Sequence, residues 1–214
     1  MWNRSCAPQL RDELGSSVAY LGVDPTRRFL ERARARASEL ALVNATFCEG
    51  DAQSLSDGAS HDAVLIDKVL MHVGPAGRVL ERAFGSLRPG GLVGMVEWLP
   101  VFALSLPNDM VGDYNALFQS MLYDWNVASH LKGHALRAGF QDVEVGSFLV
   151  TADSLNDNAF WRDFVPAQLS IAAHQGLLFE ARSSQIAAAF QEAERSGAFF
   201  GAFLVRAGTA RRPA

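Results

Sequence analysis

Acidic residues stand at, or soon after, the ends of four apolar segments of the chain. Asp24 follows the segment 18–23, and Asp51, Asp67 and Glu97 occupy comparable places further along. A carboxylate can accept two hydrogen bonds, as it does from the paired hydroxyls of a ribose. For a single acid such as Asp24, a cap of the following helix is an equally good interpretation. Four acids at equivalent positions favour a shared ligand.

Histidines offer a candidate base and a candidate metal site. His72 follows Asp67 by five residues, and a neutral imidazole is in general able to accept a proton near pH 7. The alternative is a histidine that caps a short helix or packs at the surface. His130 and His134 are one helical turn apart, which is compatible with a metal. They have no third ligand in view, so we favour a solvated helix face and expect no metal.

The elements that must position these residues are strands alternating with helices. Helices are expected after Pro25, before the turn at 88–91, over 129–138 and within 154–196. This alternation predicts an α/β fold, doubly wound, with a mostly parallel sheet. In such a sheet ligands bind beyond the carboxyl ends of the strands, where the acids are placed. The expected strands are 18–23, 45–48, 63–66, 92–96, 143–150 and 198–205.

Composition excludes several classes of function. The 214 residues are 49% hydrophobic and 20% charged with a net charge of −4, which is typical of one soluble globular domain over residues 1–214. This charge gives no general attraction to nucleic acid or anionic lipid. No apolar run reaches the roughly 18 residues that cross a bilayer, and no secretory signal is evident. We therefore expect a cytoplasmic protein without nucleic-acid or membrane partners, whose Cys6 and Cys48 are reduced.

Two aromatic-rich segments, about 99–128 and 153–197, are expected to form helical lids. Such lids would suit a small-molecule acceptor with an apolar or aromatic portion. The alternative is that the aromatic residues pack the lids onto the body, which we favour for most of them. Tyr114 and Trp125 have polar tips and are better candidates for contact with an acceptor. The tail at 211–214 is expected to fray.

Four segments follow one another in a recognisable order: VAYLGVD at 18–24, EGDA at 49–52, HDAVLID at 61–67 and LRPGG at 87–91. This order resembles class I methyltransferases that depend on S-adenosylmethionine (SAM). The resemblance is greatest to the small-molecule type of the ubiquinone and menaquinone pathways and its bacterial relatives. It covers roughly residues 10–96, with a weaker match at the last strand. It implies a Rossmann-like fold whose last strand is antiparallel.

The resemblance also implies SAM as the cofactor and assigns roles at the first two strand ends. Asp24 would hold the ribose hydroxyls, and Pro25 would lie near the adenine. Asp51 and Ala52 would meet the adenine edge.

Three further residues acquire roles from the resemblance. Asp67 and Lys68 would line the cleft beside the methionine part of SAM. His72 is at a position where the family often carries a histidine facing the cleft, which makes it the candidate catalytic residue. Methyl transfer is an in-line displacement, so alignment of acceptor and donor can supply much of the rate, and a base is needed only if the acceptor loses a proton. The expected function is SAM-dependent methyl transfer to a small organic acceptor.

The chain departs from the family at its start. Family members begin with a strand and a glycine-rich turn, whereas residues 9–14 already read as the helix after that turn. We expect the first strand and the glycine-rich loop to be missing, either because the true start lies upstream or because the chain is genuinely shortened. The alternative function is a non-catalytic methyltransferase-like protein that has lost SAM binding. A nicotinamide-dependent oxidoreductase ranks last, because its glycine fingerprint is not evident.

Overall fold

The structure, a computed structural model, describes residues 18–55 and 58–214. It divides into two compact units, unit 1 (residues 1–57) and unit 2 (residues 58–214). Several expectations fall outside the described residues. They concern Cys6, the helix at 9–14, and the first strand and glycine-rich loop that would precede that helix. A single domain over residues 1–214 stays a prediction.

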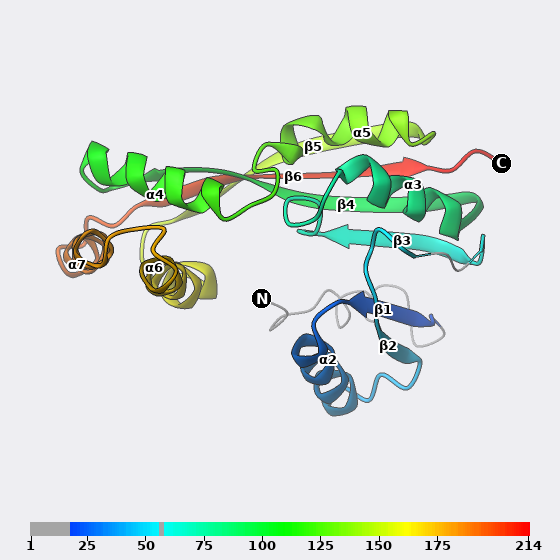
Figure 1. Ribbon diagram of the computed structural model, residues 1–214, viewed down its shortest axis with the longest axis horizontal. Helices are drawn as coiled ribbons and strands as arrows, with labels where there is room; N and C mark the ends of the chain where they lie inside the picture. Colours follow the sequence, from blue (N-terminus) through cyan, green and yellow to red (C-terminus); the bar gives the residue numbers. More distant parts are fainter. Residues whose placement is uncertain (1–17, 56–57) are drawn as a thin grey trace. The chain divides into compact units, whose positions relative to one another are not determined.

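Within its described residues, 18–55, unit 1 contains a helix packed on two parallel strands (Figure 1). The strands β1 (Tyr20–Asp24) and β2 (Ala45–Glu49) are joined by α2 (Arg27–Glu39). The helix buries Leu30 and Ala37, while its arginines are exposed to solvent. The arginine-rich face of α2 is therefore a solvated face, and the apolar face holds the helix on the strands.

Unit 2 contains a four-stranded mixed sheet with the strand order β3-β4-β6-β5 (Figure 1). Its strands are β3 (His61–Asp67), β4 (Leu87–Leu104), β5 (Gln141–Ala152) and β6 (Gly201–Arg211). β3 runs parallel to β4, and β6 runs antiparallel to both β4 and β5. The predicted α/β fold with an antiparallel last strand is confirmed.

Two helices, α3 (Ala76–Ser86) and α5 (Leu131–Arg137), lie on the same face of this sheet and contact each other (Figure 1). The short 3₁₀ helix η2 (Val127–His130) leads into α5. Val93 and Met95 of β4 are completely buried. The helices and η2 contribute a further set of buried apolar residues: Ala76, Val79, Leu80, Ala83, Val127, Ala128, Leu131 and Ala135.

β4 is much longer than the predicted strand at 92–96. It continues to Leu104, so the first segment expected as a lid begins as a strand. Pro100 has no N–H to give to the sheet, and the β4–β6 register shifts between Leu99 and Ala103. An irregularity of this kind is how a strand accommodates a proline without ending.

A side chain of α4 (Asn108–Ser120) replaces the strand partner at this irregularity. Asn115 accepts a hydrogen bond from the N–H of Phe102 at 2.6 Å and donates one to the carbonyl of Phe102 at 3.0 Å. Because both backbone groups of Phe102 are satisfied, β4 extends past the proline at little energetic cost.

The extended part of β4 borders an aromatic core. This core is closed by η3 (Phe160–Phe164), which is a π-helix, and by α6 (Val165–His174) and α7 (Glu180–Arg195). Trp161 and Tyr114 are completely buried in it. The second segment expected as a lid is thus helical and packs onto the sheet through aromatic side chains.

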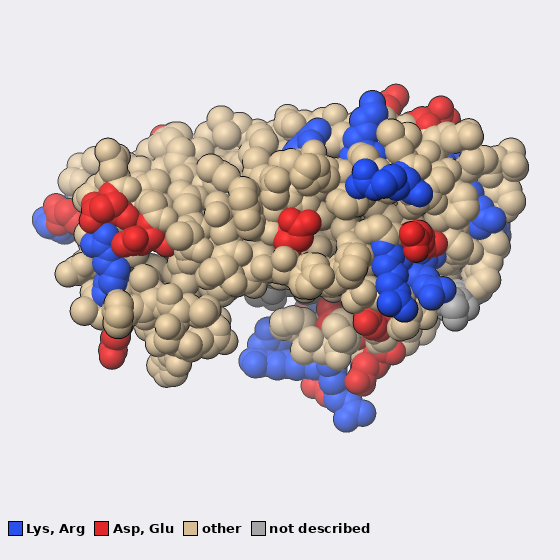
Figure 2. Space-filling model, turned by 45° about the horizontal axis from the view of Figure 1, so that its top comes forward, with Lys and Arg blue, Asp and Glu red and all other residues tan. Residues whose placement is uncertain are grey.

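Charged side chains are scattered and mixed in sign on the face shown in Figure 2. One cluster joins two helices: Arg182 of α7 bonds Asp109 and Asp113 of α4, each at 2.6 Å. Over the described ranges, no helix is both long enough and apolar enough to span a bilayer.

β1 and β3 each pair with one strand only within the described residues, so the strands form two separate sheets. An unpaired strand edge leaves backbone N–H and C=O groups without a ladder partner. The absence of a central strand would leave such edges on its two neighbours. That absence itself stays a prediction.

The tail after β6 is anchored, so the expectation that it frays is wrong. Gly90 donates its N–H to the carbonyl of Arg212 at 3.0 Å, and Arg212 donates its own N–H to Gly91 at 2.8 Å. The guanidinium of Arg212 lies over the ring of Phe84, 4.9 Å from its centroid. These contacts with the turn at 88–91 hold the tail in place.

Gly208 of β6 lies so close to β5 that no side chain fits. A Cβ there would collide with the carbonyl oxygen of Glu144 and lie 2.8 Å from Cγ2 of Val145. We expect Gly208→Ala to lower the free energy of unfolding by about 1–3 kcal/mol, the usual range for overpacking. Urea unfolding measures it. The matched control is Gly146→Ala, whose Cβ would meet its nearest neighbour at an ordinary 3.5 Å; equal effects of the two changes would contradict this explanation.

Candidate functional site

The carboxyl ends of the two strands of unit 1 adjoin. Asp24 is the last residue of β1, and its carbonyl accepts the N–H of Gly50, just after β2, at 3.3 Å. The carboxylate Oδ1 of Asp24 accepts the N–H of Thr26 at 2.7 Å. This bond holds the turn before α2 and is not the helix cap offered as the alternative to a ligand contact, because the N-cap residue is Thr26 and has no side-chain cap hydrogen bond. It occupies one of the two carboxylate oxygens and leaves the other for a ligand.

Asp51 shapes the turn after β2 in the same way. Its Oδ1 accepts the N–H of Gln53 at 2.9 Å, and its carbonyl accepts the N–H of Ser54 at 2.9 Å. Asp51 is exposed, and Ala52 beside it is half-buried. Pro25 is exposed at the start of α2. The four residues predicted in unit 1 therefore lie at, or just beyond, the ends of two neighbouring strands.

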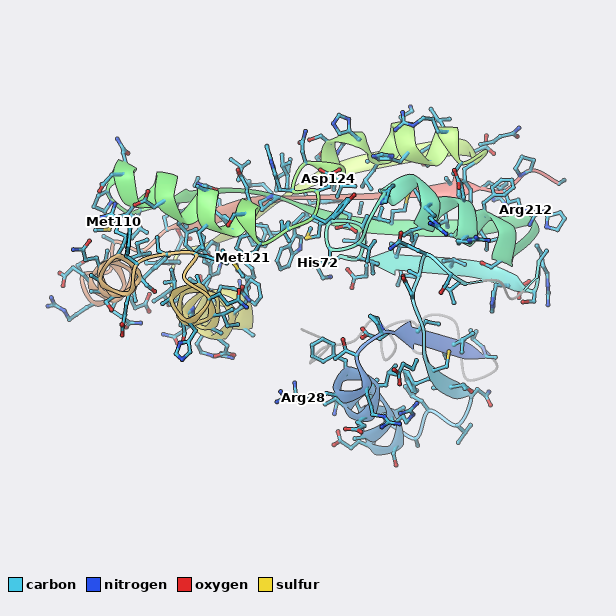
Figure 3. All side chains as sticks on the ribbon, in the orientation of Figure 1. Arg28, His72, Met110, Met121, Asp124 and Arg212 are labelled. Carbon is cyan, nitrogen blue, oxygen red and sulfur yellow. The ribbon has the colours of Figure 1, made fainter. Side chains whose placement is uncertain are left out.

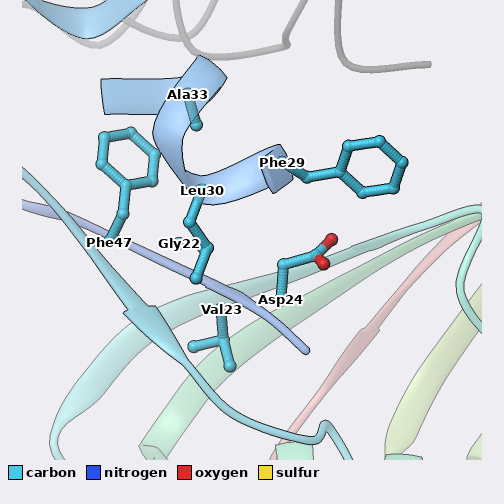
Figure 4. Close-up of a pocket in the computed structure, with 7 residues that line it drawn as sticks. All are labelled: Gly22, Val23, Asp24, Phe29, Leu30, Ala33 and Phe47. Carbon is cyan, nitrogen blue, oxygen red and sulfur yellow. The ribbon is translucent and has the colours of Figure 1, made fainter. Parts of the chain in front are cut away.

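A small cavity lies between β1 and α2 (Figure 4). Its volume is about 10 Å³, enough for about one water molecule and far too little for an adenine. Gly22 keeps this interior tight, because a Cβ there would lie 2.6 Å from Cδ1 of Phe47. A nucleoside would have to bind outside the strand ends, and the carboxylate of Asp24 lies on the Phe29 side of the cavity (Figure 4).

In unit 2 the chain leaves β3 through a strained residue. Lys68 has a φ of 55°, in the left-handed region that non-glycine residues rarely adopt. Its N–H donates to the carbonyl of Val96 at 2.7 Å, and its Nζ pairs with the carboxylate of Asp67. Strained backbone of this kind is concentrated at functional sites, which makes the position consistent with a role for both residues.

The loop that follows, residues 67–72, is bonded to Glu97 of β4. Oε1 of Glu97 accepts the N–H of Val69 at 2.9 Å and that of Leu70 at 2.7 Å. The side chain is completely buried, and within the described residues Oε2 has no hydrogen-bond partner. The pKa of Glu97 is raised to about 7, mainly by burial and also by the charge of Asp67, against the opposing effects of the two N–H groups and Lys68.

Sequence reasoning placed Glu97 among the strand-ending acids and gave it no role in the site. The placement is wrong, because β4 continues to Leu104 and Glu97 lies within the strand. A signal was available, because Val93, Met95 and Glu97 occupy alternate positions of one strand. Side chains at alternate positions share a face, so an apolar alternation that ends in an acid places that acid in the core.

His72 ends this loop, and much of its surface is open to solvent. The part of the residue that lies against the protein is desolvated, which lowers the pKa of His72 and favours the neutral form that can accept a proton. The carbonyl of Met71 accepts the N–H groups of Tyr123 at 2.9 Å and Asp124 at 3.2 Å. The segment containing Asp124 therefore lies against the loop that carries His72 (Figure 3). The catalytic role of His72 stays a prediction.

The two aromatic residues singled out for contact with an acceptor have different environments. Tyr114 is completely buried among other rings, and burial raises its pKa. It belongs to the core, so its expected contact with an acceptor is wrong. Trp125 is 38% exposed and directly follows the segment that contacts the His72 loop, and its contact with an acceptor stays a prediction.

His130 and His134 have ring centroids 6.2 Å apart. His130 lies 3.3 Å from the amide nitrogen of Asn126, and His134 lies 3.1 Å from a guanidinium nitrogen of Arg137. In the part of the chain that the structure describes, no three histidine, cysteine or acidic side chains are grouped as metal ligands.

The structure thus gathers the predicted site residues into two groups. Asp67, Lys68 and His72 lie on one loop of unit 2, and Glu97 joins them. The remaining four lie at the strand ends of unit 1. The convergence of both groups on one ligand stays a prediction.

The chain matches the model of a family described as a methyltransferase domain over residues 6–126, more than half of its length. It therefore belongs to this methyltransferase family, which confirms the resemblance read from the sequence. The demethylmenaquinone methyltransferase of Lactococcus lactis is 34% identical over 89 residues, which are 41% of this chain and 35% of that protein. The chain spans between 26% and 35% of the length of the curated relatives that it matches.

Solved structures show the same fold. Phosphoethanolamine N-methyltransferase 2 of Haemonchus contortus, in complex with phosphomonomethylethanolamine and S-adenosylhomocysteine, has a TM-score of 0.58 and 17% identity. The likeness covers 97% of this chain and 46% of that one. The [4+2]-cyclase SpnF has a TM-score of 0.54 and 21% identity over 97% of this chain and 71% of its own. At these identities the likeness shows the fold alone.

Proposed function

We propose that this chain binds SAM and takes part in transfer of its methyl group to a small organic acceptor. Membership of the methyltransferase family supports the reaction class. The observation that carries the proposal is the placement of Asp24, Asp51 and Asp67 at or just beyond the ends of parallel strands. Ligands of open parallel sheets bind at that edge.

The residues of unit 1 fit the nucleoside part of SAM. Asp24 uses Oδ1 for the Thr26 N–H, and a carboxylate has a second oxygen for ribose hydroxyls. Asp51 and Ala52 follow the neighbouring strand end, where they would meet the adenine edge, and Pro25 would lie near its ring.

The residues of unit 2 fit the methionine part and the acceptor. SAM supplies an electrophilic methyl group on a sulfonium, so the task of the protein is to align an acceptor with it. Asp67 and Lys68 would line the methionine part. A neutral His72 would accept a proton from an acceptor that must lose one. The exposed ring of Trp125 would suit an acceptor with an apolar or aromatic portion.

The second candidate is a non-catalytic methyltransferase-like protein that does not bind SAM. The observation in its favour is the separation of β1 and β3 into two sheets within the described residues. The fold also serves other chemistry, since the structurally similar SpnF is a [4+2]-cyclase.

Calorimetric titration with SAM tests the proposal. The same titration with the variant Asp24→Asn tests the role of the Asp24 carboxylate. Asparagine keeps an oxygen for the Thr26 N–H, so the turn is preserved while the charge is lost. We expect SAM affinity to fall about 10- to 100-fold, because a hydrogen bond to a charged group contributes about 1.5–3 kcal/mol.

The matched control is Glu49→Gln, which removes the same charge at the position opposite Asp24 in the β1–β2 register. We expect it to leave SAM affinity within about two-fold of the wild type, since charge alone acts weakly at an exposed position. Absence of any heat and of any thermal shift with the wild-type protein would favour the non-catalytic candidate.

A further inference from the structure

One buried carboxyl holds the loop after β3. Glu97 accepts both the Val69 and the Leu70 N–H through a single oxygen, at 2.9 Å and 2.7 Å. These donors directly follow the strained residue Lys68. A left-handed backbone is unfavourable for a non-glycine residue, and it persists only where its surroundings hold it. Here it is held by the two hydrogen bonds that Glu97 accepts and by the one that the Lys68 N–H donates to the carbonyl of Val96.

Among the described residues, Lys68 and Arg206 are cations close to Glu97 in the sheet or the loop, and their hydrogen-bond partners are other groups. Lys68 pairs with Asp67. Arg206 stands directly opposite Glu97 in the β4–β6 register, but its guanidinium donates to the carbonyls of Ala128 and Ser129, each at 3.2 Å. The contacts of Glu97 are therefore with backbone, and they depend on an acceptor oxygen at that place, which a neutral side chain can also supply.

We propose that Glu97 is a positioning residue of the cofactor site: through Oε1 it fixes the backbone of loop 67–72, which presents Asp67 and Lys68 to the methionine part of SAM. This inference rests on the proposed function. Glu97 itself touches neither cofactor nor acceptor, and its effect on binding is transmitted through the loop.

Amide hydrogen exchange tests the hold on the loop without any ligand. In Glu97→Leu we expect the amides of Val69 and Leu70 to exchange at least about 10-fold faster than in the wild type, because both lose their acceptor. Glu97→Gln keeps an acceptor oxygen and should restore exchange to within about three-fold. If the leucine variant fails to fold, Glu97→Asp replaces it, since the shorter side chain draws the oxygen away from both donors. Unchanged exchange in the folded variant overturns the inference.

Calorimetric titration with SAM and with adenosine tests the link to the site. We expect the leucine or aspartate variant to bind SAM at least about 10-fold more weakly than the wild type and adenosine equally well, with Glu97→Gln like the wild type for both. Equal SAM affinity of all variants overturns the inference on Glu97 and leaves the proposed function intact. Equal losses for SAM and adenosine also overturn it, since they indicate a general structural defect. Failure of the wild-type protein to bind SAM overturns the proposed function and this inference together.

Discussion

Replacing Trp161 by alanine is expected to lower the free energy of unfolding by about 3–5 kcal/mol, the range measured for large aromatic residues removed from a core. The side chain is completely buried. Its ring lies 4.9 Å from that of Phe160 and 5.7 Å from that of Phe199, in edge-on contacts. It also covers Gly201 so closely that a Cβ there would lie 2.7 Å from the indole. Truncation to alanine would leave a cavity between these neighbours.

Urea unfolding followed by far-ultraviolet circular dichroism measures this change. The matched control is Trp125→Ala, because that indole is 38% exposed and should contribute less than half as much. A loss below about 1 kcal/mol for Trp161→Ala would contradict the tight packing of η3 against β6.

The stability of the protein is expected to fall between pH 4.5 and pH 7 because of Glu97. Its pKa is raised from 4.5 to about 7 in the folded protein. Below pH 4.5 the group is protonated in both states, and its contribution to stability is fully present. As the pH rises to 7, the unfolded chain releases the proton while the folded protein keeps it, so stability is lost. Above pH 7 both states are ionised, and the total loss is about 3 kcal/mol.

Comparison with Glu97→Gln isolates this effect. The pKa of His72 and that of His134 are lowered in the folded protein, so both histidines make stability rise with pH below 6.5 and partly mask Glu97. They are unchanged in the variant. The acids with lowered pKa values lose their contribution only as the pH falls below about 4.5. We expect the stability of the wild type relative to that of the variant to fall by about 3 kcal/mol from pH 4.5 to pH 7. A constant difference would mean that the pKa of Glu97 is not raised in the fold.

The order of strands and helices could be predicted because each element carries its own apolar pattern. The run 63–66 lies within β3, and the periodic stripe ending near Leu87 became α3. These patterns are local, and local signals are what a sequence displays directly. The antiparallel direction of β6 came from the family resemblance, since periodicity carries no information on strand direction.

The length of β4 could not be predicted, because its compensation is distant in sequence. A proline such as Pro100 usually ends a strand, because it has no N–H to donate to the neighbouring strand. The structure continues it with a hydrogen-bonding side chain, Asn115, that lies 13 residues beyond Phe102. The burial of Glu97 depends likewise on N–H groups 27 and 28 residues earlier in the chain. Contacts of this kind exist only once the elements pack.

The positions of the candidate site residues could be predicted from the sequence, but their roles could not. Asp24 and Asp51 stand at the strand ends where sequence placed them, and each also holds the turn that follows it. The same carboxylate can cap a turn and accept from a ligand, so residue type and spacing do not separate the two roles. Binding measurements do.

The position of β6 has a consequence for biosynthesis. Gly201–Arg211 comes after every other described element in chain order, yet it lies between two strands made much earlier. In a nascent polypeptide that has reached only α7, β3 can pair with β4, but no strand lies between β4 and β5, and both offer an unpaired edge to other chains. The sheet of unit 2 cannot be completed until Gly201–Arg211 leaves the ribosome. We therefore expect formation of this sheet to be slow, late and sensitive to chaperones that shield strand edges.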